Sequence, residues 1–303
     1  PIMAMIVQGL KVDNESSYKN DKKAGLDLIV EELSSITNLE ILRTYPHIRS
    51  KTYEKNRWTG LAINTKHPDK LLDNTEFRVI LDKMIDARDI MKKSYEGGAR
   101  PITGPFHPSF GIQNEGLLDR YEADMSVIKK QLEDDFDITD INGKLHRLDK
   151  KTGDRKPLEF TILYSKMFVS DGSREQDALI AIKDKFESYG ITIILDGNSR
   201  EGYNRKILGD NWHLAFDQKE FSWNNNIWPI FNKDNKSHTG NVTGYHTPVL
   251  TDLLSKFFRT PNIRAKQELG EQIHQHCYDN VPYLFLWSPE PVCFYRNVIR
   301  DLT

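Results

Sequence analysis

The chain has 303 residues and a formal net charge of −2, with 38% hydrophobic and 28% charged residues. These values fit one large or two medium globular domains and argue against a disordered chain. The slight negative charge argues against a nucleic-acid-binding protein, which needs a basic face to replace phosphate counterions. No apolar run in the sequence approaches the ~18–20 residues that span a bilayer.

The chain opens on the apolar run Met3–Val7, which predicts a strand, and no signal peptide precedes it. We therefore expect a fragment or a processed form that starts inside a longer protein. The next extended, apolar patterns predict strands at Leu26–Val30, Asn38–Thr44 and Arg57–Asn64.

Helical patterns follow. Asn74 or Thr75 can cap a helix whose apolar residues recur at helical spacing through Ile85. A second helix is predicted at Arg88–Tyr95, ended by a glycine pair. The proline-rich segment 100–108 predicts a loop, and Leu117–Leu132 predicts another amphipathic helix.

The middle of the chain predicts a strand–helix–strand unit. After a predicted hairpin turn at Asn142-Gly143, a strand is expected at Leu158–Leu163 and a helix from Ser173, which begins a capping box. The continuous apolar run Ile191–Leu195 is typical of a parallel strand covered on both faces. Such a unit needs a right-handed crossover, so the predicted fold class is α/β.

The last third alternates strands and helices around the polar loop 233–244. The expected elements are strands at Trp212–Phe216, Tyr283–Trp287 and Val292–Tyr295 and helices at Pro248–Phe258 and Ile263–Tyr278. Five continuous apolar residues in Tyr283–Trp287 indicate a buried strand.

An ordered series of short motifs resembles the family of extracellular solute-binding proteins of ABC importers, the peptide/nickel type. The motifs run over nearly the whole chain and are densest near its end. They include Gly25-Leu-Asp27, Leu61-Ala-Ile-Asn64, Phe77-Arg78, Gly98-Ala-Arg-Pro101, Gly104-Pro-Phe-His-Pro108, Asn142-Gly-Lys144, Tyr189-Gly-Ile-Thr192, Asn241-Val-Thr-Gly-Tyr245, Pro248, Asp252-Leu-Leu254, Arg264 and Val281-Pro-Tyr-Leu-Phe-Leu-Trp287.

The resemblance implies a type II periplasmic-binding-protein-like fold of two hinged lobes, of which this chain is the C-terminal portion. Residues 1–67 would be a remnant of the first lobe with the hinge, 68–285 the α/β second lobe, and 286–303 the return into the first lobe. Asn64–Pro68 and Leu284–Pro291 should then run side by side, with Met3–Val7 and Val292–Tyr295 in one smaller unit.

The implied function is a non-enzymatic one. The protein would bind a peptide, sugar or similar small solute between its lobes and deliver it to a membrane permease. The implied location is periplasmic or cell-surface, with a lipid anchor at a missing N-terminus. A secreted hydrolase acting on a saccharide or peptide is the alternative.

Aromatic side chains crowd the stretch 212–228, where they are interleaved with asparagines. Aromatic walls with a few polar groups suit a solute pocket, and core packing is the other reading of the same pattern. The candidate solute contacts are Trp212, His213, Phe216, Asp217, Trp223, Asn224, Asn241 and Tyr245.

Family members that bind peptides often carry Trp-x-x-Asp here, with the aspartate on the ligand's ammonium. One register matches Trp212 and leaves Ala215 at the acid; another matches Phe216 and leaves Lys219 there. Asp217 or a nearby glutamate could substitute for that acid.

No catalytic residue, metal ligand or cofactor is assigned. Nucleophile motifs and phosphate-binding glycine loops are absent from the sequence, and Cys277 and Cys293 match no metal spacing. Glu271, His274 and His276 invite a metal interpretation, but a solvated helix face is favoured.

Overall fold

The structure is a computed structural model. It describes residues 28–29, 44, 46, 48–52, 56–95, 98–112, 117, 120–149, 152–221, 226–290 and 292–296. The predicted strand Met3–Val7 and most of Asn38–Thr44 lie outside these residues.

A six-stranded mixed sheet forms the centre of the molecule, in the order β4-β11-β3-β10-β8-β9. Strand β8 runs parallel to both β9 and β10, whereas β3 is antiparallel to β10 and β11. The strands are β3 (Arg57–Ile63), β4 (Ala99–Pro101), β8 (Glu159–Ser165), β9 (Thr192–Asn198), β10 (Leu214–Glu220) and β11 (Tyr283–Pro289). The predicted α/β fold class is confirmed.

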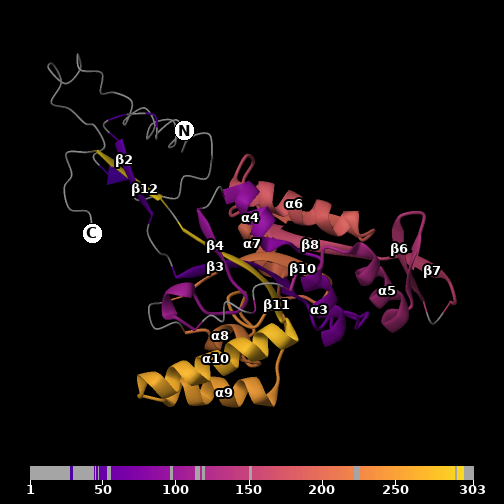
Figure 1. The fold of residues 1–303 in the computed structure, drawn as a ribbon. Coiled ribbons are helices and arrows are strands. Elements are labelled where there is room, and N and C mark those ends of the chain that lie inside the picture. Colours follow the sequence, from indigo (N-terminus) through magenta and orange to yellow (C-terminus); the bar gives the residue numbers. More distant parts are fainter. Residues whose placement is uncertain are drawn as a thin grey trace.

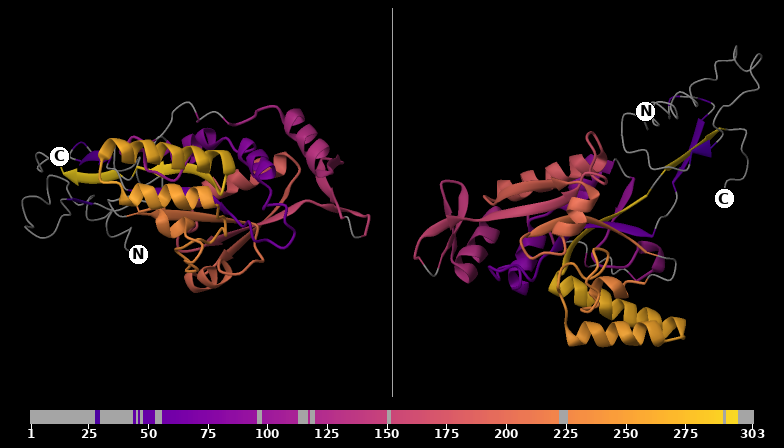
Figure 2. Two further views of the ribbon diagram at one scale, coloured as in Figure 1. Left: turned by 90° about the horizontal axis from the view of Figure 1, so that it is seen from below. Right: turned by 180° about the vertical axis from the view of Figure 1, so that it is seen from behind.

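Helices cover both faces of this sheet (Figures 1 and 2). One face packs against α3 (Thr75–Lys83), α4 (Ala87–Tyr95), α5 (Met125–Phe136) and α6 (Arg174–Ser188). The other packs against α7 (Arg200–Lys206), α8 (Trp228–Phe231), α9 (Pro248–Arg259) and α10 (Ile263–Asn280). None of the described helices is long and apolar enough to cross a bilayer.

Side-chain alternation divides the core into two layers, one on each side of the sheet. Along β3, Leu61 and Ile63 enter the core beneath α3–α6, whereas Trp58 and Ala62 enter the core beneath α7–α10. Successive side chains of a strand point to opposite faces, so a central strand with helices on both sides is buried throughout, as all seven residues of β3 are.

Helix boundaries follow the capping residues. Ser173 caps α6 as predicted, since its hydroxyl accepts the backbone N–H of Gln176 at 3.1 Å. Asn74 caps α3 in the same way. The prediction of a helix starting at Leu117 was wrong: α5 starts at Met125, because Asp124 accepts the N–H of Ser126 at 2.8 Å.

The strand predicted at Ile191–Leu195 exists as β9, but it is not covered on both faces. It is the edge strand of the sheet, and Ile194 is 44% exposed. An apolar run alone does not show whether a strand is central or at an edge.

Two smaller sheets flank this body. One is the antiparallel sheet β1 (Leu28–Ile29), β12 (Val292–Arg296) and β2 (Ile48–Thr52), which stands apart at one end (Figure 1). The other contains β5 (Ile138–Ile141), β6 (Lys144–Leu148) and β7 (Arg155–Pro157), and its first turn is the predicted Asn142-Gly143, with φ of 55° and 80°. A short 3-10 turn, η1 (Pro108–Phe110), lies in the proline-rich loop.

The predicted pairing of Leu284–Pro291 with Asn64–Pro68 was wrong, because the partner is the strand just before that segment. Strand β11 pairs with β3, from Tyr283 opposite Ala62 to Trp287 opposite Thr59, and not with Asn64–Pro68. Asn64 instead donates its side-chain amide to the Trp212 carbonyl at 2.7 Å. As expected, Val292–Tyr295 is outside the six-stranded sheet.

Replacing Gly60 by alanine should lower the free energy of unfolding by about 1–3 kcal/mol, measured in urea. A Cβ at Gly60 would lie 2.6 Å from the Leu284 carbonyl oxygen, which belongs to the neighbouring strand and cannot move without breaking the ladder. Gly209→Ala is the matched control, because its Cβ would meet its nearest atom at 3.4 Å. Equal stability of the two variants would contradict the close approach.

Candidate functional site

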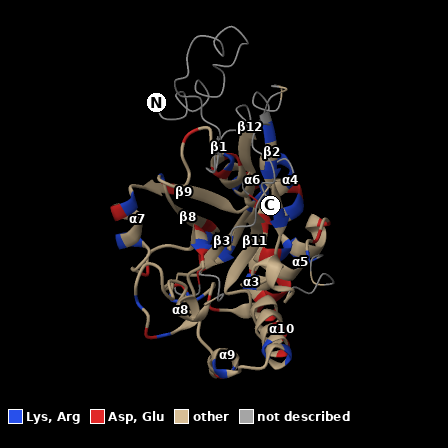
Figure 3. Ribbon diagram, turned by 90° about the vertical axis from the view of Figure 1, so that its left-hand side faces the viewer, with Lys and Arg blue, Asp and Glu red and all other residues tan. Residues whose placement is uncertain are grey.

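A cavity of about 370 Å³ and another of about 460 Å³ stand out in the described residues. The larger one lies where the parallel strands β8 and β10 end, and α7 and α8 complete its wall. Figure 3 shows α7 beside β8 and β9. Ligands of open α/β sheets bind outside the carboxyl ends of the parallel strands. We call this space the edge cavity and take it as the candidate site.

The edge cavity lies at the end of the six-stranded sheet where β3 begins and β11 ends, next in sequence to the small sheet of β1, β12 and β2. There Glu220, the last residue of β10, is opposite Arg57, the first residue of β3. The Phe221 N–H donates to the Asn56 carbonyl at 2.8 Å, and the Ser288 hydroxyl to the Arg57 carbonyl at 2.7 Å.

An ion pair on β10 forms part of the wall. Asp217 and Lys219 are two residues apart, so they point to the same face of the strand. The Lys219 Nζ lies 2.6 Å from Asp217 Oδ2, with 8% and 7% of the two side chains exposed. Tyr203 of α7 also lines the cavity and is buried, and burial first and Asp217 second raise the pKa of its phenol well above the usual value.

Of the eight side chains predicted to contact solute, Asp217 lines the edge cavity. Phe216, next to it in β10, points into the core on the opposite face of the sheet. Trp212 is buried, and its indole N–H donates to the carbonyls of Ile207 and Gly209. Those hydrogen bonds close the turn before β10, so the Trp212 side chain stabilises the fold there.

His213 lies at the other end of β10. Its ring stacks on His67 with centroids 4.1 Å apart, and His67 Nδ1 is 3.0 Å from Asp69 Oδ1. Burial chiefly, and His67 secondarily, lower the pKa of His213 to about 4. His213 is therefore neutral over the physiological range.

These three side chains bring one ligand atom each within 4.8 Å of the others, a spacing that permits a metal ion. However, the Thr161 N–H donates to His213 Nδ1 at 3.1 Å. A neutral imidazole has one lone-pair nitrogen, so His213 then carries its proton on Nε2 and has none left for a metal. Two ligands remain, too few for a closed site.

Asn241 and Tyr245 organise the loop before α9. The Asn241 amide donates to the Tyr245 carbonyl at 2.9 Å, and its oxygen accepts the Gly244 N–H at 3.0 Å. The Tyr245 hydroxyl is 3.0 Å from His276 Nε2. These contacts account for the polar loop as a structural turn.

Trp223 and Asn224 lie outside the described residues. The eight candidates are thus spread over both ends of β10, both faces of the sheet and one loop. Their role as solute contacts stays a prediction.

The residues of the edge cavity that sequence reasoning did not predict include Lys219, Tyr203 and Arg200. Lys219 had appeared only as a mismatch at an expected acid. The signal that was available is alternation, because Asp217 and Lys219 share one face in any strand of this stretch. Tyr203 and Arg200 belong to α7, and no local sequence pattern predicts that this helix lies beside β8 and β9.

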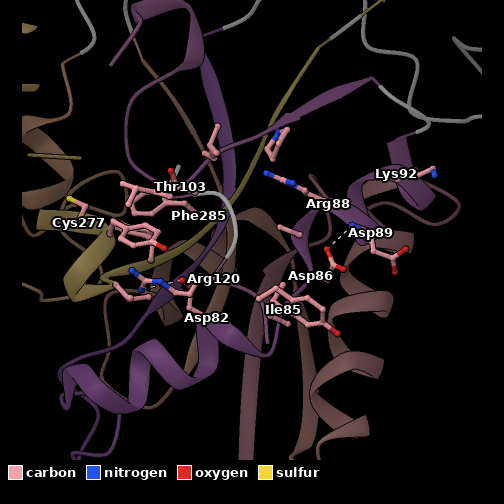
Figure 4. A pocket seen from close by; sticks show the side chains of 18 residues that line it. Asp82, Ile85, Asp86, Arg88, Asp89, Lys92, Thr103, Arg120, Cys277 and Phe285 are labelled. Atoms are coloured by element: carbon pink, nitrogen blue, oxygen red, sulfur yellow. Dashed lines mark hydrogen bonds and ion pairs between the residues drawn. The ribbon is translucent and has the colours of Figure 1, made fainter. Parts of the chain in front are cut away.

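The smaller cavity lies between α3, α4 and α10 (Figure 4). Asp82 and Arg120 point toward each other on one side of it, 3.3 Å apart, and Cys277 and Phe285 lie on another side. Burial raises the pKa of Asp82 to about 6 although Arg120 opposes the shift. At neutral pH the two charges cancel, and no parallel strand ends here.

His274 was expected on a solvated helix face, and this was wrong. Its side chain is buried, with 1% exposed, and Nε2 is 2.9 Å from the Thr103 hydroxyl. Gly104 makes room for the ring, since a Cβ there would lie 2.5 Å from it.

No protein-family model matches the chain, and no curated protein sequence matches it. Solved structures do match, and they define the class of fold: that of solute-binding proteins of ABC transporters. The periplasmic-binding-protein-like α/β fold class that the resemblance implied is confirmed.

Three of these structures show the extent of the match. The periplasmic binding protein DppA from Helicobacter pylori, in complex with the peptide STSA, is 18% identical, with a TM-score of 0.70 over 89% of this chain and 48% of that chain. AppA from Bacillus subtilis, in complex with a nonapeptide, is 15% identical, with a TM-score of 0.72 over 92% of this chain and 53% of that chain. NikZ from Campylobacter jejuni, in complex with Ni(L-His), is 16% identical, with a TM-score of 0.67 over 93% of this chain and 54% of that chain. The chain spans about half the length of these proteins.

Proposed function

We propose that this chain is part of a non-enzymatic solute-binding subunit of an ABC importer, which holds a small solute and delivers it to a membrane permease. The observation that carries the proposal is the edge cavity, placed at the carboxyl ends of parallel strands in a fold shared with peptide- and nickel-binding proteins. Its volume of about 460 Å³ is in the range of small-molecule sites.

The two-lobe division is part of the proposal. Residues 1–67 would belong to the first lobe and the hinge, 68–285 to the second lobe, and 286–303 to the return. The support is that β1, β2 and β12 form a sheet of their own, while β3 and β11, side by side, adjoin it in sequence. A solute contacting both lobes would favour the closed form.

The proposed location is outside the cytoplasm, in the periplasm or at the cell surface, with a lipid anchor. Its support is that DppA from Helicobacter pylori, which has a similar fold, is an ABC transporter-associated periplasmic binding protein. An importer's binding subunit has to meet its solute before the permease does.

Native mass spectrometry of the protein, purified in the longest form that its gene encodes, tests the proposal. We expect a non-covalent adduct of small mass on a substantial fraction of the molecules. Acid should release that solute chemically unchanged, because no bond is made or broken. Recovery of a cleaved product, or an adduct-free spectrum from several growth media, would contradict a binding role.

A further inference from the structure

The smaller cavity, of about 370 Å³, borders a stretch of β11 that has a neighbouring strand on one side only. We call it the β11 cavity. Strand β4 pairs with Trp287–Pro289, and this pairing ends where the Ile102 N–H donates to the Leu286 carbonyl. Tyr283 and Phe285, which precede these residues in β11, line the cavity instead. The outer edge of β11 is therefore open to the cavity at Tyr283 and Phe285.

The strand register shows that main-chain hydrogen-bonding groups point to this opening. The Ile63 N–H of β3 donates to the Pro282 carbonyl, and in an antiparallel ladder every second residue then bonds to the neighbouring strand. Leu284 therefore bonds to β3, whereas Tyr283 and Phe285 turn their N–H and C=O groups away from β3. Both residues are buried, and in the described part of the chain these groups have no hydrogen-bond partner. Buried amide groups are normally paired, so a bound molecule would complete this edge.

A pair of opposite charges forms another wall of the β11 cavity, where Arg120 and Asp82 point toward each other (Figure 4). Arg120 Nη1 lies 3.3 Å from Asp82 Oδ2, which is longer than the roughly 2.7–2.9 Å of a charge-assisted hydrogen bond. The Arg120 guanidinium carbon lies over the Tyr278 ring, 3.5 Å from its centroid. The Arg120 and Asp82 side chains stay 13% and 24% exposed. This wall thus offers a donor beside an acceptor.

The charged side chains that line the β11 cavity are balanced. Three are acids and three are bases: Asp82, Asp86, Asp89, Arg88, Lys92 and Arg120. A site that selects an ion needs an excess of the opposite charge, because the ion has to give up its hydration. The cavity provides no such excess. Its other lining groups include hydrogen-bonding groups and the aromatic side chains of Tyr121, Tyr278, Tyr283 and Phe285.

We propose that the β11 cavity binds a small, uncharged, planar ring that contains a cyclic amide. In such a ring the N–H and C=O groups lie on the same side, as they do in one residue at a strand edge, so the two can exchange a pair of hydrogen bonds. A single open-chain amide is trans and points these groups in opposite directions. Aromatic side chains on the wall, such as Phe285, suit a planar ring. A second amide in the ring can bond to Arg120 and Asp82.

This inference goes beyond the proposed function and does not depend on it, since the β11 cavity and the edge cavity have no lining residue in common.

Calorimetry of the protein, in the longest form that its gene encodes, tests the inference with four rings. Uracil contains cyclic amides, 1,3-dimethyluracil lacks their N–H groups, and benzoate and benzamidine carry opposite charges. We expect dimethyluracil to bind at least about tenfold more weakly than uracil, because it leaves a buried β11 carbonyl unpaired. Both charged rings should also bind at least about tenfold more weakly, because the cavity does not offset their loss of hydration.

Amide hydrogen exchange, followed by NMR, locates the bound ring. Saturating uracil should slow the exchange of the Tyr283 or the Phe285 N–H at least about tenfold, since that N–H gains an acceptor. Leu284 is the internal control, because its N–H already faces β3 and its exchange should not change.

Arg120→Gln supplies the change in the protein. It should weaken the binding of uracil about fivefold or more, while Arg205→Gln, at an exposed position of α7 outside the wall of the β11 cavity, should not. Circular dichroism checks that both variants are folded. If Arg120→Gln does not fold, the exchange experiment on the unaltered protein still decides.

Equal binding of uracil and dimethyluracil, tighter binding of either charged ring, or no binding of uracil would overturn the inference. So would binding that leaves the exchange of both the Tyr283 and the Phe285 amide unchanged, because the ring would then lie elsewhere.

Discussion

Replacing Arg78 by methionine is expected to lower the free energy of unfolding by about 3–5 kcal/mol, measured in urea. Arg78 is on α3 with 1% of its surface exposed. Its guanidinium donates to the carbonyls of Leu72 and Asp73 before the helix and of Asn280 and Val281 at the end of α10. Methionine fills similar space but leaves all these acceptors without a donor.

The last carbonyls of a helix have no partner within the helix. Arg78 supplies a donor for the end of α10. A single side chain thus joins the start of α3 to the end of α10, although Arg78 and Asn280 are 202 residues apart in the sequence. Arg264→Met is the control, because that side chain is 91% exposed, and its replacement should cost within about 0.5 kcal/mol. A loss below about 1 kcal/mol for Arg78→Met would show that water replaces the guanidinium.

Lowering the pH from about 6.5 to about 4 should destabilise the protein through His274, by up to about 3 kcal/mol. Burial lowers the pKa of His274 to about 4, below its usual 6.5. Between these values the unfolded chain binds the proton and the folded chain does not. Stability is therefore full above about 6.5 and falls until about pH 4, where both states are protonated.

The contribution of His274 can be separated from those of other groups. His213, with its pKa also lowered to about 4, acts in the same direction. Asp82, with its pKa raised to about 6, acts in the opposite direction and stabilises the fold as pH falls toward 3.8. Urea unfolding of the protein and of His274→Leu from pH 7.5 to 4.5 isolates the histidine. Parallel curves would refute its burial as a neutral ring.

Local sequence signals predicted much of the fold. The start of α6 was predictable because the Ser173 side chain accepts the N–H of Gln176, three residues later. The hairpin turn at Asn142-Gly143 was predictable because both residues readily adopt positive φ. Features that depend on contacts between residues far apart in the sequence were not predictable. Nothing local shows that β9 is an edge strand, or that the ring of His274 packs on Gly104.

The candidate site was predictable to the extent that it lies on β10. Asp217 was a candidate because it could substitute for the acid that peptide-binding family members carry, and alternation places Lys219 on the same face of the strand. Phe216 points into the core beneath α3–α6, whereas Asp217 lines the edge cavity, because neighbouring residues of a strand point to opposite faces. Tyr203 enters the site only through the packing of α7, which depends on tertiary structure.

The position of β3 in the centre of the sheet constrains the order in which the protein can fold. Both of its hydrogen-bonded neighbours are made much later: β10 starts at Leu214 and β11 ends at Pro289. During synthesis β3 leaves the ribosome as an unpaired strand, and its first neighbour, β10, follows it only about 150 residues later. By contrast, β8, α6 and β9 are contiguous in sequence and can form their parallel pair early. Since closing long loops is slow, sheet completion should limit the rate of folding.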